Sequence, residues 1–188
     1  MGNLVHESLK ELYTPVVGME LNNELLTIMK KKSKDALTAQ YKIQLNTVAV
    51  TGNHKLTFEV AKKFIEHQIE HDLADVKKGH KLVIKELEQD HSCHVNLKIN
   101  DKLDVAFNLF GKIDRIDEFD GNIRIIDYKT GGTAAADVRN KKLEQLLENK
   151  SPKSVQLMLY KYMYWKNTGQ EVDSGILSLK NISSGYLQ

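Results

Sequence analysis

The residues best suited to chemistry in this 188-residue chain lie within one short stretch, residues 111–131. Asp120-Gly121 predicts a tight β-hairpin, because both central residues of a type I′ turn need positive φ. That turn places Asp114 opposite Asp127 on the neighbouring strand. Directly opposed side chains have Cβ atoms about 4.5 to 5.5 Å apart, where two carboxylates repel unless a cation lies between them. The hairpin therefore predicts a divalent-cation site.

A lysine shares this predicted site. Strand side chains alternate, so Asp127 and Lys129 project from one face, while Tyr128 points the other way and leaves its carbonyl able to bind a cation. An Asp-x-Lys triplet alone means little, because acids and lysines are ordinary on exposed hairpins. Here Ile123 and Ile125 share the face of both charged residues, which makes that face apolar. Charges placed there favour a functional role over a solvated hairpin.

The elements that must position the hairpin fall into two parts. Up to about residue 78, apolar residues recur at helical spacing and predict a helical part. From Lys81 the spacing becomes that of strands, with four runs separated by turns: 81–87, 95–99, 105–116 and 122–129. A polar helical segment then precedes a helix that Ser151-Pro152 begins and Gly169 ends. A last strand is predicted over 175–179.

Size and composition predict one compact domain over 1–188, with the helical part at about 1–78 and the sheet and core at about 79–188. The single cysteine, Cys93, excludes an internal disulfide framework and favours the cytoplasm. No leader follows Met1 and no apolar run approaches the roughly 20 residues that span a bilayer, so no membrane partner is expected. A net charge of +2 does not decide nucleic-acid binding.

Four short motifs occur in a defined order: Gly2-x-x-x-His6, Gly111-x-x-Asp114, Asp127-Tyr-Lys129-Thr-Gly and Gln156-x-x-x-Tyr160. In this order the chain resembles the PD-(D/E)xK superfamily of nucleases, and within it the domain at the C-terminus of RecB and AddB helicase-nucleases. The resemblance extends from His6 to the final strand. It is strongest over 111–131 and weak over about 19–78.

The resemblance implies an α/β fold with a central mixed β-sheet flanked by helices, a restriction-endonuclease-like core, beside the N-terminal helical part. It implies Mg²⁺ or Mn²⁺ bound by His6, Asp114, Asp127 and the Tyr128 carbonyl, with Lys129 as the catalytic lysine. The metal would polarise the scissile phosphate and lower the pKa of a water, while the lysine positions that water and offsets developing charge. The expected reaction is hydrolysis of phosphodiester bonds in DNA by an exonuclease.

Gln156 and Tyr160 complete the expected catalytic set. They lie four residues apart on the predicted helix and therefore share a face, from which they can orient the lysine or contact the DNA backbone. The alternative interpretation is structural: Gln156 is an ordinary polar residue and Tyr160 an amphipathic residue at the edge of the core.

The resemblance also implies partners. AddB-type domains carry four cysteines around an iron-sulfur cluster, so with only Cys93 no such cluster is expected here. The Gly-x-x-x-x-Gly-Lys-Ser/Thr motif of nucleotide-binding loops is absent from the sequence, so a helicase portion is expected in cis or in trans. We expect the nuclease module of a helicase-nuclease in DNA repair or recombination, acting on single-stranded DNA or duplex ends, in preference to a stand-alone nuclease.

A basic stretch flanks the predicted site. Residues 138–166 hold seven basic side chains against two acidic ones, together with several aromatic side chains. Basic side chains can bind the backbone of a single DNA strand while aromatic side chains stack on its bases. The candidates for DNA contact are Arg139, Lys141, Lys142, Lys153 and Lys161.

Two other possible metal-binding motifs and one other function remain as alternatives. His67-Gln-Ile-Glu70-His71 matches the motif of inverted zinc peptidases, although apolar residues on the far side of that helix favour a solvated face. The run from His91 to His94 offers ligands for a soft metal, but a turn between two strands explains it more simply. The rival function is a catalytically silent nuclease fold that binds DNA or a partner. The presence of every ligand type argues against it.

Overall fold

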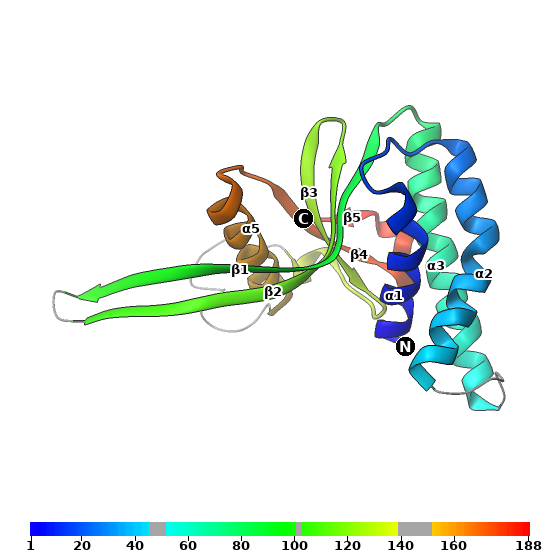
Figure 1. Ribbon diagram of the computed structural model, residues 1–188, viewed down its shortest axis with the longest axis horizontal. Coiled ribbons are helices and arrows are strands. Elements are labelled where there is room, and N and C mark those ends of the chain that lie inside the picture. The colour runs from blue at the N-terminus through cyan, green and yellow to red at the C-terminus, as the bar shows by residue number, and fades with distance from the viewer. Residues whose placement is uncertain (46–51, 101–102, 139–151) are drawn as a thin grey trace.

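The computed structural model describes residues 1–45, 52–100, 103–138 and 152–188. Within them, a mixed β-sheet has the strand order β1-β2-β3-β4-β5 and is flanked by helices (Figure 1). The parallel pair is β3 with β4, and the other neighbours are antiparallel. The strands are β1 (Leu82–Asn100), β2 (Leu103–Phe119), β3 (Asn122–Lys129), β4 (Asp173–Ser178) and β5 (Tyr186–Leu187). The predicted α/β fold class is confirmed.

The predicted helical part is also confirmed. Three helices pack side by side on one face of the sheet, and the third ends one residue before the predicted boundary (Figure 1). Their apolar side chains form one core cluster with Ile84, Ile126 and Leu177 of the sheet. The helices are α1 (Gly2–Tyr13), α2 (Asn23–Leu45) and α3 (Asn53–Lys77), with a short 3₁₀ turn, η1 (Thr14–Val16). No helix among the described residues is both long and apolar enough to cross a membrane.

Helix α5 (Pro152–Thr168) packs on the opposite face of the sheet. Successive side chains of β3 point to opposite faces of the sheet, and they show this arrangement. Ile126 belongs to the core cluster of the helical part, and Ile125 belongs to the cluster under α5. The helix begins at the predicted proline and ends just before Gly169, whose φ of 73° is the left-handed conformation that closes helices. Two further 3₁₀ turns are η2 (Ala135–Asp137) and η3 (Leu179–Ser184).

The strands on either side of residues 91–94 are one strand, and the predicted turn there is wrong. β1 has 19 residues and pairs with β2 through this region, with His91 opposite Gly111 and His94 opposite Asn108. Polar residues do not end the strand, because a projecting two-stranded ribbon is exposed to water (Figure 1). The last predicted strand corresponds to β4, but β5 after it was not predicted.

The predicted hairpin turn between β2 and β3 is present. Asp120 has φ 50° and Gly121 has φ 85°, as a type I′ turn requires. The strands pair in the predicted register, with Asp117 opposite Arg124. The Asp120 carboxylate also accepts a hydrogen bond of 2.8 Å from the backbone N–H of Lys81, which ties the turn to the start of β1.

Candidate active site

Three neighbouring strands each contribute one acid to a row across the sheet, here called the acid row: Glu88 of β1, Asp114 of β2 and Asp127 of β3. The pair Arg115 and Ile126 sets Asp114 beside Asp127, and the antiparallel register of β1 with β2 sets Glu88 opposite Asp114. All three acids are buried, with Asp127 only 2% exposed. Three carboxylates withdrawn from water at adjoining positions require compensating positive charge.

His6 reaches the acid row from α1. Its Nδ1 lies 3.0 Å from Glu88 Oε1 and 3.4 Å from Asp114 Oδ1. Burial disfavours the charged imidazole, but the hydrogen bonds and charges of Asp114 and Glu88 outweigh it and raise the pKa of His6 to about 10. The imidazolium therefore offsets part of the negative charge.

Glu88 was missed by the sequence analysis, which ended its strand at Leu87. Its φ of 49° is unusual for a residue other than glycine, and it marks a change in the hairpin's packing. Leu87 packs with the helical part, whereas Ile113, opposite Gln89, packs under α5. An unbroken strand through residues 88–94 would have placed Glu88 beside β2, and the register shift between Lys98 and Asn100 sets it opposite Asp114. The wrongly predicted turn concealed that pairing.

Asp114 and Asp127 have different hydrogen-bond environments. Asp114 Oδ2 accepts a hydrogen bond of 2.7 Å from the backbone N–H of Tyr128, which holds this carboxylate in place. Asp127 Oδ2 is buried and accepts no hydrogen bond from the described residues, although Lys129 Nζ lies 2.7 Å away as an ion-pair partner. Burial, and then the charge of Asp114, raise the pKa of Asp127 to about 6 against the opposing effect of Lys129.

The donor set fits a hard divalent cation. Ligand atoms of His6, Glu88 and Asp114 all lie within 4.8 Å of one another. Carboxylate oxygens suit Mg²⁺ and Mn²⁺, and a single imidazole is compatible with Mn²⁺. The Asp127 carboxylate, which the β2–β3 register sets beside Asp114, adds an acceptor next to this group.

The side of the site formed by α5 holds Lys129. Lys129 Nζ donates to Gln156 Oε1 at 3.2 Å, Gln156 Nε2 donates to Tyr160 Oη at 2.8 Å, and Tyr160 Oη donates to the Lys112 carbonyl at 2.8 Å. A Cβ on Gly111 would lie 3.0 Å from the Tyr160 ring, so glycine is needed for this close approach. The structure thus brings the two helix residues to the lysine, in the arrangement expected for orienting it.

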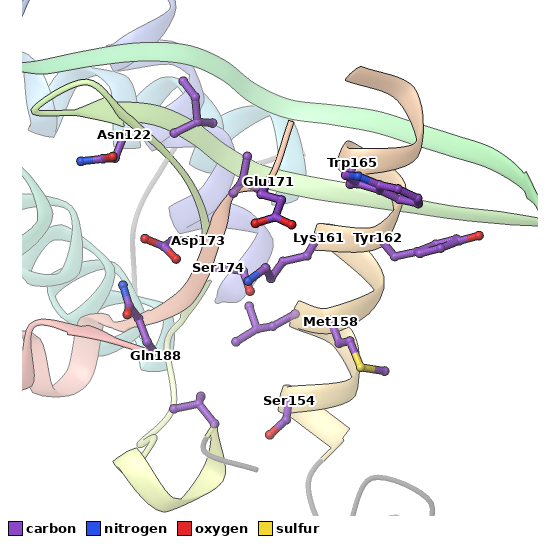
Figure 2. A pocket seen from close by; sticks show the side chains of 14 residues that line it. Asn122, Ser154, Met158, Lys161, Tyr162, Trp165, Glu171, Asp173, Ser174 and Gln188 are labelled. Carbon is purple, nitrogen blue, oxygen red and sulfur yellow. The ribbon is translucent and has the colours of Figure 1, made fainter. Parts of the chain in front are cut away.

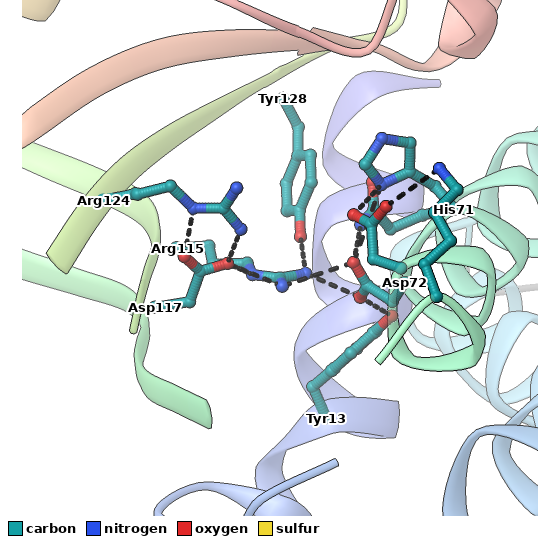
Figure 3. A network of polar contacts seen from close by, with 10 residues as sticks. Tyr13, His71, Asp72, Arg115, Asp117, Arg124 and Tyr128 are labelled. Atoms are coloured by element: carbon teal, nitrogen blue, oxygen red, sulfur yellow. Dashed lines mark hydrogen bonds and ion pairs between the residues drawn. The ribbon is translucent and has the colours of Figure 1, made fainter. Parts of the chain in front are cut away.

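Tyr128 points its side chain away from the acid row, as strand alternation predicts. Its hydroxyl accepts a hydrogen bond of 3.2 Å from Arg115 Nη1 on the other side of the sheet. There it joins a group of buried polar side chains, here called the Arg115 network (Figure 3): Tyr13, Asp72, Arg115, Asp117, Arg124 and Tyr128.

Each of the six residues of the Arg115 network has a hydrogen-bond or ion-pair partner within it. Arg115 has no exposed surface and lies 2.8 Å from Asp72 Oδ2 and 2.7 Å from Asp117 Oδ2. Arg124 Nε donates to Asp117 Oδ1 at 2.9 Å, and Tyr13 donates to Asp72 Oδ2 at 2.5 Å. The network joins α1 and α3 to β2 and β3 directly behind the acid row.

The predicted DNA-contacting residues lie apart from the acid row or outside the described residues. Arg139, Lys141 and Lys142 belong to the second group. Lys153 Nζ contacts Asp137 Oδ2 and Thr133 Oγ1, each at 3.0 Å. Lys161 lines a hollow of about 800 Å³ between α5 and the first residues of β3 and β4 (Figure 2). That hollow is lined by none of the predicted catalytic residues.

The alternative metal motifs have other partners. Glu70 pairs with Lys30 at 2.6 Å, and His67 Nδ1 lies 3.4 Å from the Leu179 carbonyl. In the second motif, His91 Nε2 contacts Glu86 at 2.8 Å and His94 Nδ1 contacts Asn108 at 2.9 Å. Neither motif forms a group of three converging ligands within the described part of the chain.

A comparison with protein families places the chain beside known nucleases. The profile of a protein family, the PD-(D/E)XK nuclease superfamily, matches residues 1–188. No curated protein and no solved structure gives a significant match.

Proposed function

Because the chain belongs to the PD-(D/E)XK nuclease superfamily, we propose that it is a metal-dependent deoxyribonuclease that hydrolyses phosphodiester bonds at the acid row. The observation that carries this proposal is the ion pair between the buried Asp127 carboxylate and Lys129, whose Nζ lies 2.7 Å from Asp127 Oδ2. A carboxylate and an ammonium at one buried position serve two different tasks, metal ligation and charge stabilisation. The motif order in the sequence assigns the same two tasks to these residues.

The residues that would hold Mg²⁺ or Mn²⁺ are His6, Glu88, Asp114, Asp127 and the Tyr128 carbonyl. When bound, the cation supplies Lewis-acid polarisation of the phosphate and lowers the pKa of a water. With one cysteine in the chain, a four-cysteine iron-sulfur cluster is not part of this proposal.

The chain's own residues position the substrate and stabilise charge. Lys129 offsets the negative charge that develops on the phosphoryl oxygens and orients the attacking water. Gln156 accepts a hydrogen bond from the lysine, and Tyr160 fixes Gln156 through the Lys112 carbonyl. Because these hydrogen bonds form a chain to β2, the ammonium is held in place before the substrate arrives. Such preorganisation removes the cost of arranging the charge during reaction.

The motif order further supports a RecB-like module comprising one catalytic domain over 1–188. In this proposal it acts as an exonuclease on single-stranded DNA or duplex ends and works with a helicase portion, in cis or in trans, during DNA repair or recombination. Linear and circular DNA distinguish the exonuclease from an endonuclease, because a circle has no ends.

Cleavage of linear and circular DNA in Mg²⁺, Mn²⁺ or EDTA tests the proposal. We expect the linear substrate to be degraded with either metal, the circle to be spared, and no cleavage in EDTA. Glu88→Gln should require more metal for half-maximal cleavage. Its matched control is Glu86→Gln, because Glu86 lies on the same strand but pairs with His91 outside the acid row. Retained DNA binding without metal-dependent cleavage would instead support the silent binding module.

A further inference from the structure

An aromatic side chain stands exposed beside the candidate active site. Phe110 of β2 is 81% exposed, although it is a large apolar residue. Strand alternation places it on the same face of the hairpin as Lys112, the second residue before Asp114. At about 3.3 Å per residue, the Cα atoms of Phe110 and Asp114 are at most about 13 Å apart. The ring therefore lies within reach of the nucleotides that flank a phosphate bound at the acid row.

Two hollows meet at Phe110. One of about 310 Å³ lies between β2 and α5 and is lined by Phe110 together with Gln156 and Tyr160, two of the candidate site residues. The other, of about 390 Å³, is lined by residues 90–92 of β1 and 110–112 of β2. Phe110 consequently lines two hollows, one of which also borders the hydrogen-bonded residues Gln156 and Tyr160.

A positive charge lies between Phe110 and the acid row, on Lys112. Lys112 Nζ is 2.9 Å from Glu88 Oε2, and the side chain is 44% exposed. An exposed ammonium between the aromatic ring and the acids can contact a phosphate while the ring contacts a base. This combination of a cationic path and an aromatic face is how proteins bind single strands without sequence preference.

An exposed aromatic ring can distinguish single strands from duplexes. Within a duplex both faces of each base are covered by neighbouring bases. An unpaired base can leave that stack and lie on an aromatic side chain. We infer that Phe110 is a stacking platform for an unpaired nucleobase beside the scissile phosphate, so that the site takes single-stranded nucleic-acid ends. This inference rests on the proposed function, because it assigns the substrate class of the same site.

Exposed apolar side chains also occur singly on protein surfaces without a function, so an internal comparison is needed. Phe107 provides it. It lies on the same strand, is 41% exposed and is opposite Val95, which packs under α5. Its position in the strand alternation differs from that of Phe110, and it lies farther from the acid row. Phe107→Ala is therefore the matched control.

Binding in EDTA tests the inference without relying on cleavage. A fluorescein-labelled single-stranded oligodeoxynucleotide is titrated with each variant and followed by anisotropy. Phe110→Ala should raise the Kd about tenfold, within the range for removing one aromatic side chain from a stacked base. Phe110→Trp should retain wild-type affinity, and Phe107→Ala should stay within about twofold of it. Affinity for a blunt duplex should be unchanged by Phe110→Ala.

A cycle with abasic oligonucleotides identifies the stacked base. Removal of the base at one position should weaken wild-type binding about as much as Phe110→Ala does, and the two changes together should cause no further loss. Losses that multiply at every abasic position would overturn the inference, as would equal affinities for Phe110→Ala and Phe107→Ala. Phe110 is a surface residue, so its substitutions should leave the fold intact.

The two proposals fail in different ways. If the wild type cleaves DNA with metal but the abasic cycle shows no coupling to Phe110, the stacking platform is wrong and the nuclease remains. If the cycle shows coupling but no metal-dependent cleavage occurs, the stacking platform stands and the nuclease is wrong.

Discussion

Asp114 and Arg115 are neighbours on β2, yet they belong to two charged clusters with opposite properties. In the Arg115 network, two arginines face two aspartates, and tyrosine hydroxyls occupy remaining hydrogen-bonding positions (Figure 3). In the acid row, three carboxylates adjoin one another and one buried oxygen accepts no hydrogen bond from the described residues. One strand thus separates aspartates that arginines hold from several directions from an acid row in which Asp127 Oδ2 has an ion pair with Lys129.

The pKa shifts of the two clusters differ in the same way. Burial opposes the charge of Asp72, but the charge and hydrogen bonds of Arg115 outweigh it and hold the pKa of Asp72 well below its usual range. Burial and the neighbouring Asp114 raise the pKa of Asp127 to about 6. A buried acid whose pKa is held low by an arginine is structural, whereas a buried acid whose pKa is raised by burial and a neighbouring acid is a candidate ligand.

The largest effect is expected from Arg115→Met. It leaves Asp72 and Asp117 buried without this counter-charge, so the free energy of unfolding should fall by about 3 to 5 kcal/mol. Urea denaturation measures the change. Lys30→Met is the control, because its exposed pair with Glu70 should contribute less than about 1 kcal/mol.

If Arg115→Met does not fold, a double variant keeps the prediction testable. Adding Asp72→Asn removes one of the uncompensated charges, so the double variant should be more stable than Arg115→Met alone. An Arg115→Met protein as stable as wild type would show that the network is dispensable.

Lys129→Ala should reduce cleavage by about 10² to 10³ or more, because it removes preorganised charge stabilisation. Metal binding should persist, since the lysine is not a ligand, and Lys129→Arg should not restore cleavage, because the planar guanidinium does not replace a compact ammonium. Single-turnover cleavage and calorimetric Mn²⁺ titration measure the two properties separately. Normal cleavage by Lys129→Ala would refute the assigned role.

Asp127→Asn should have the opposite effect to Arg115→Met on the metal-free protein. It removes a buried charge that faces Asp114, so stability in EDTA at pH 8 should rise by roughly 1 to 3 kcal/mol. The stabilisation by Mn²⁺, about 2.7 kcal/mol at 100 times the Kd, should be lost. Thermal melts with and without Mn²⁺ provide the measurement. Equal Mn²⁺ shifts in the variant and the wild type would exclude Asp127 as a ligand.

The smallest effect is a pH dependence of the Arg115 network. Because the pKa of Asp72 is lower in the folded protein than in the unfolded chain, its stabilisation is complete above the unfolded value near 3.8. It is lost as pH falls below that value, at up to about 1.4 kcal/mol per pH unit for one proton. Asp72→Asn should flatten this part of the stability curve, measured by urea denaturation between pH 4.5 and 2. An unchanged slope would contradict the lowered pKa.

Local chemistry in the sequence was sufficient for much of the candidate site. The Asp120-Gly121 turn sets the β2–β3 register, and strand alternation sets Asp127 and Lys129 on one face. Proline and glycine set the ends of α5, and four-residue spacing brings Gln156 and Tyr160 together. Each of these relations spans a few residues, so backbone geometry alone determines it.

Only the tertiary structure decided which distant residues contact one another at the site. Glu88 enters the acid row because β1 continues past residues 91–94 beside β2, and a polar stretch does not reveal whether a partner strand is present. His6 meets Glu88 and Asp114 because the apolar stripe of α1 packs on the sheet at one orientation. Arg115 pairs with Asp72 of α3 for the same reason. Such contacts depend on how whole elements pack, which the spacing of residues along one element does not specify.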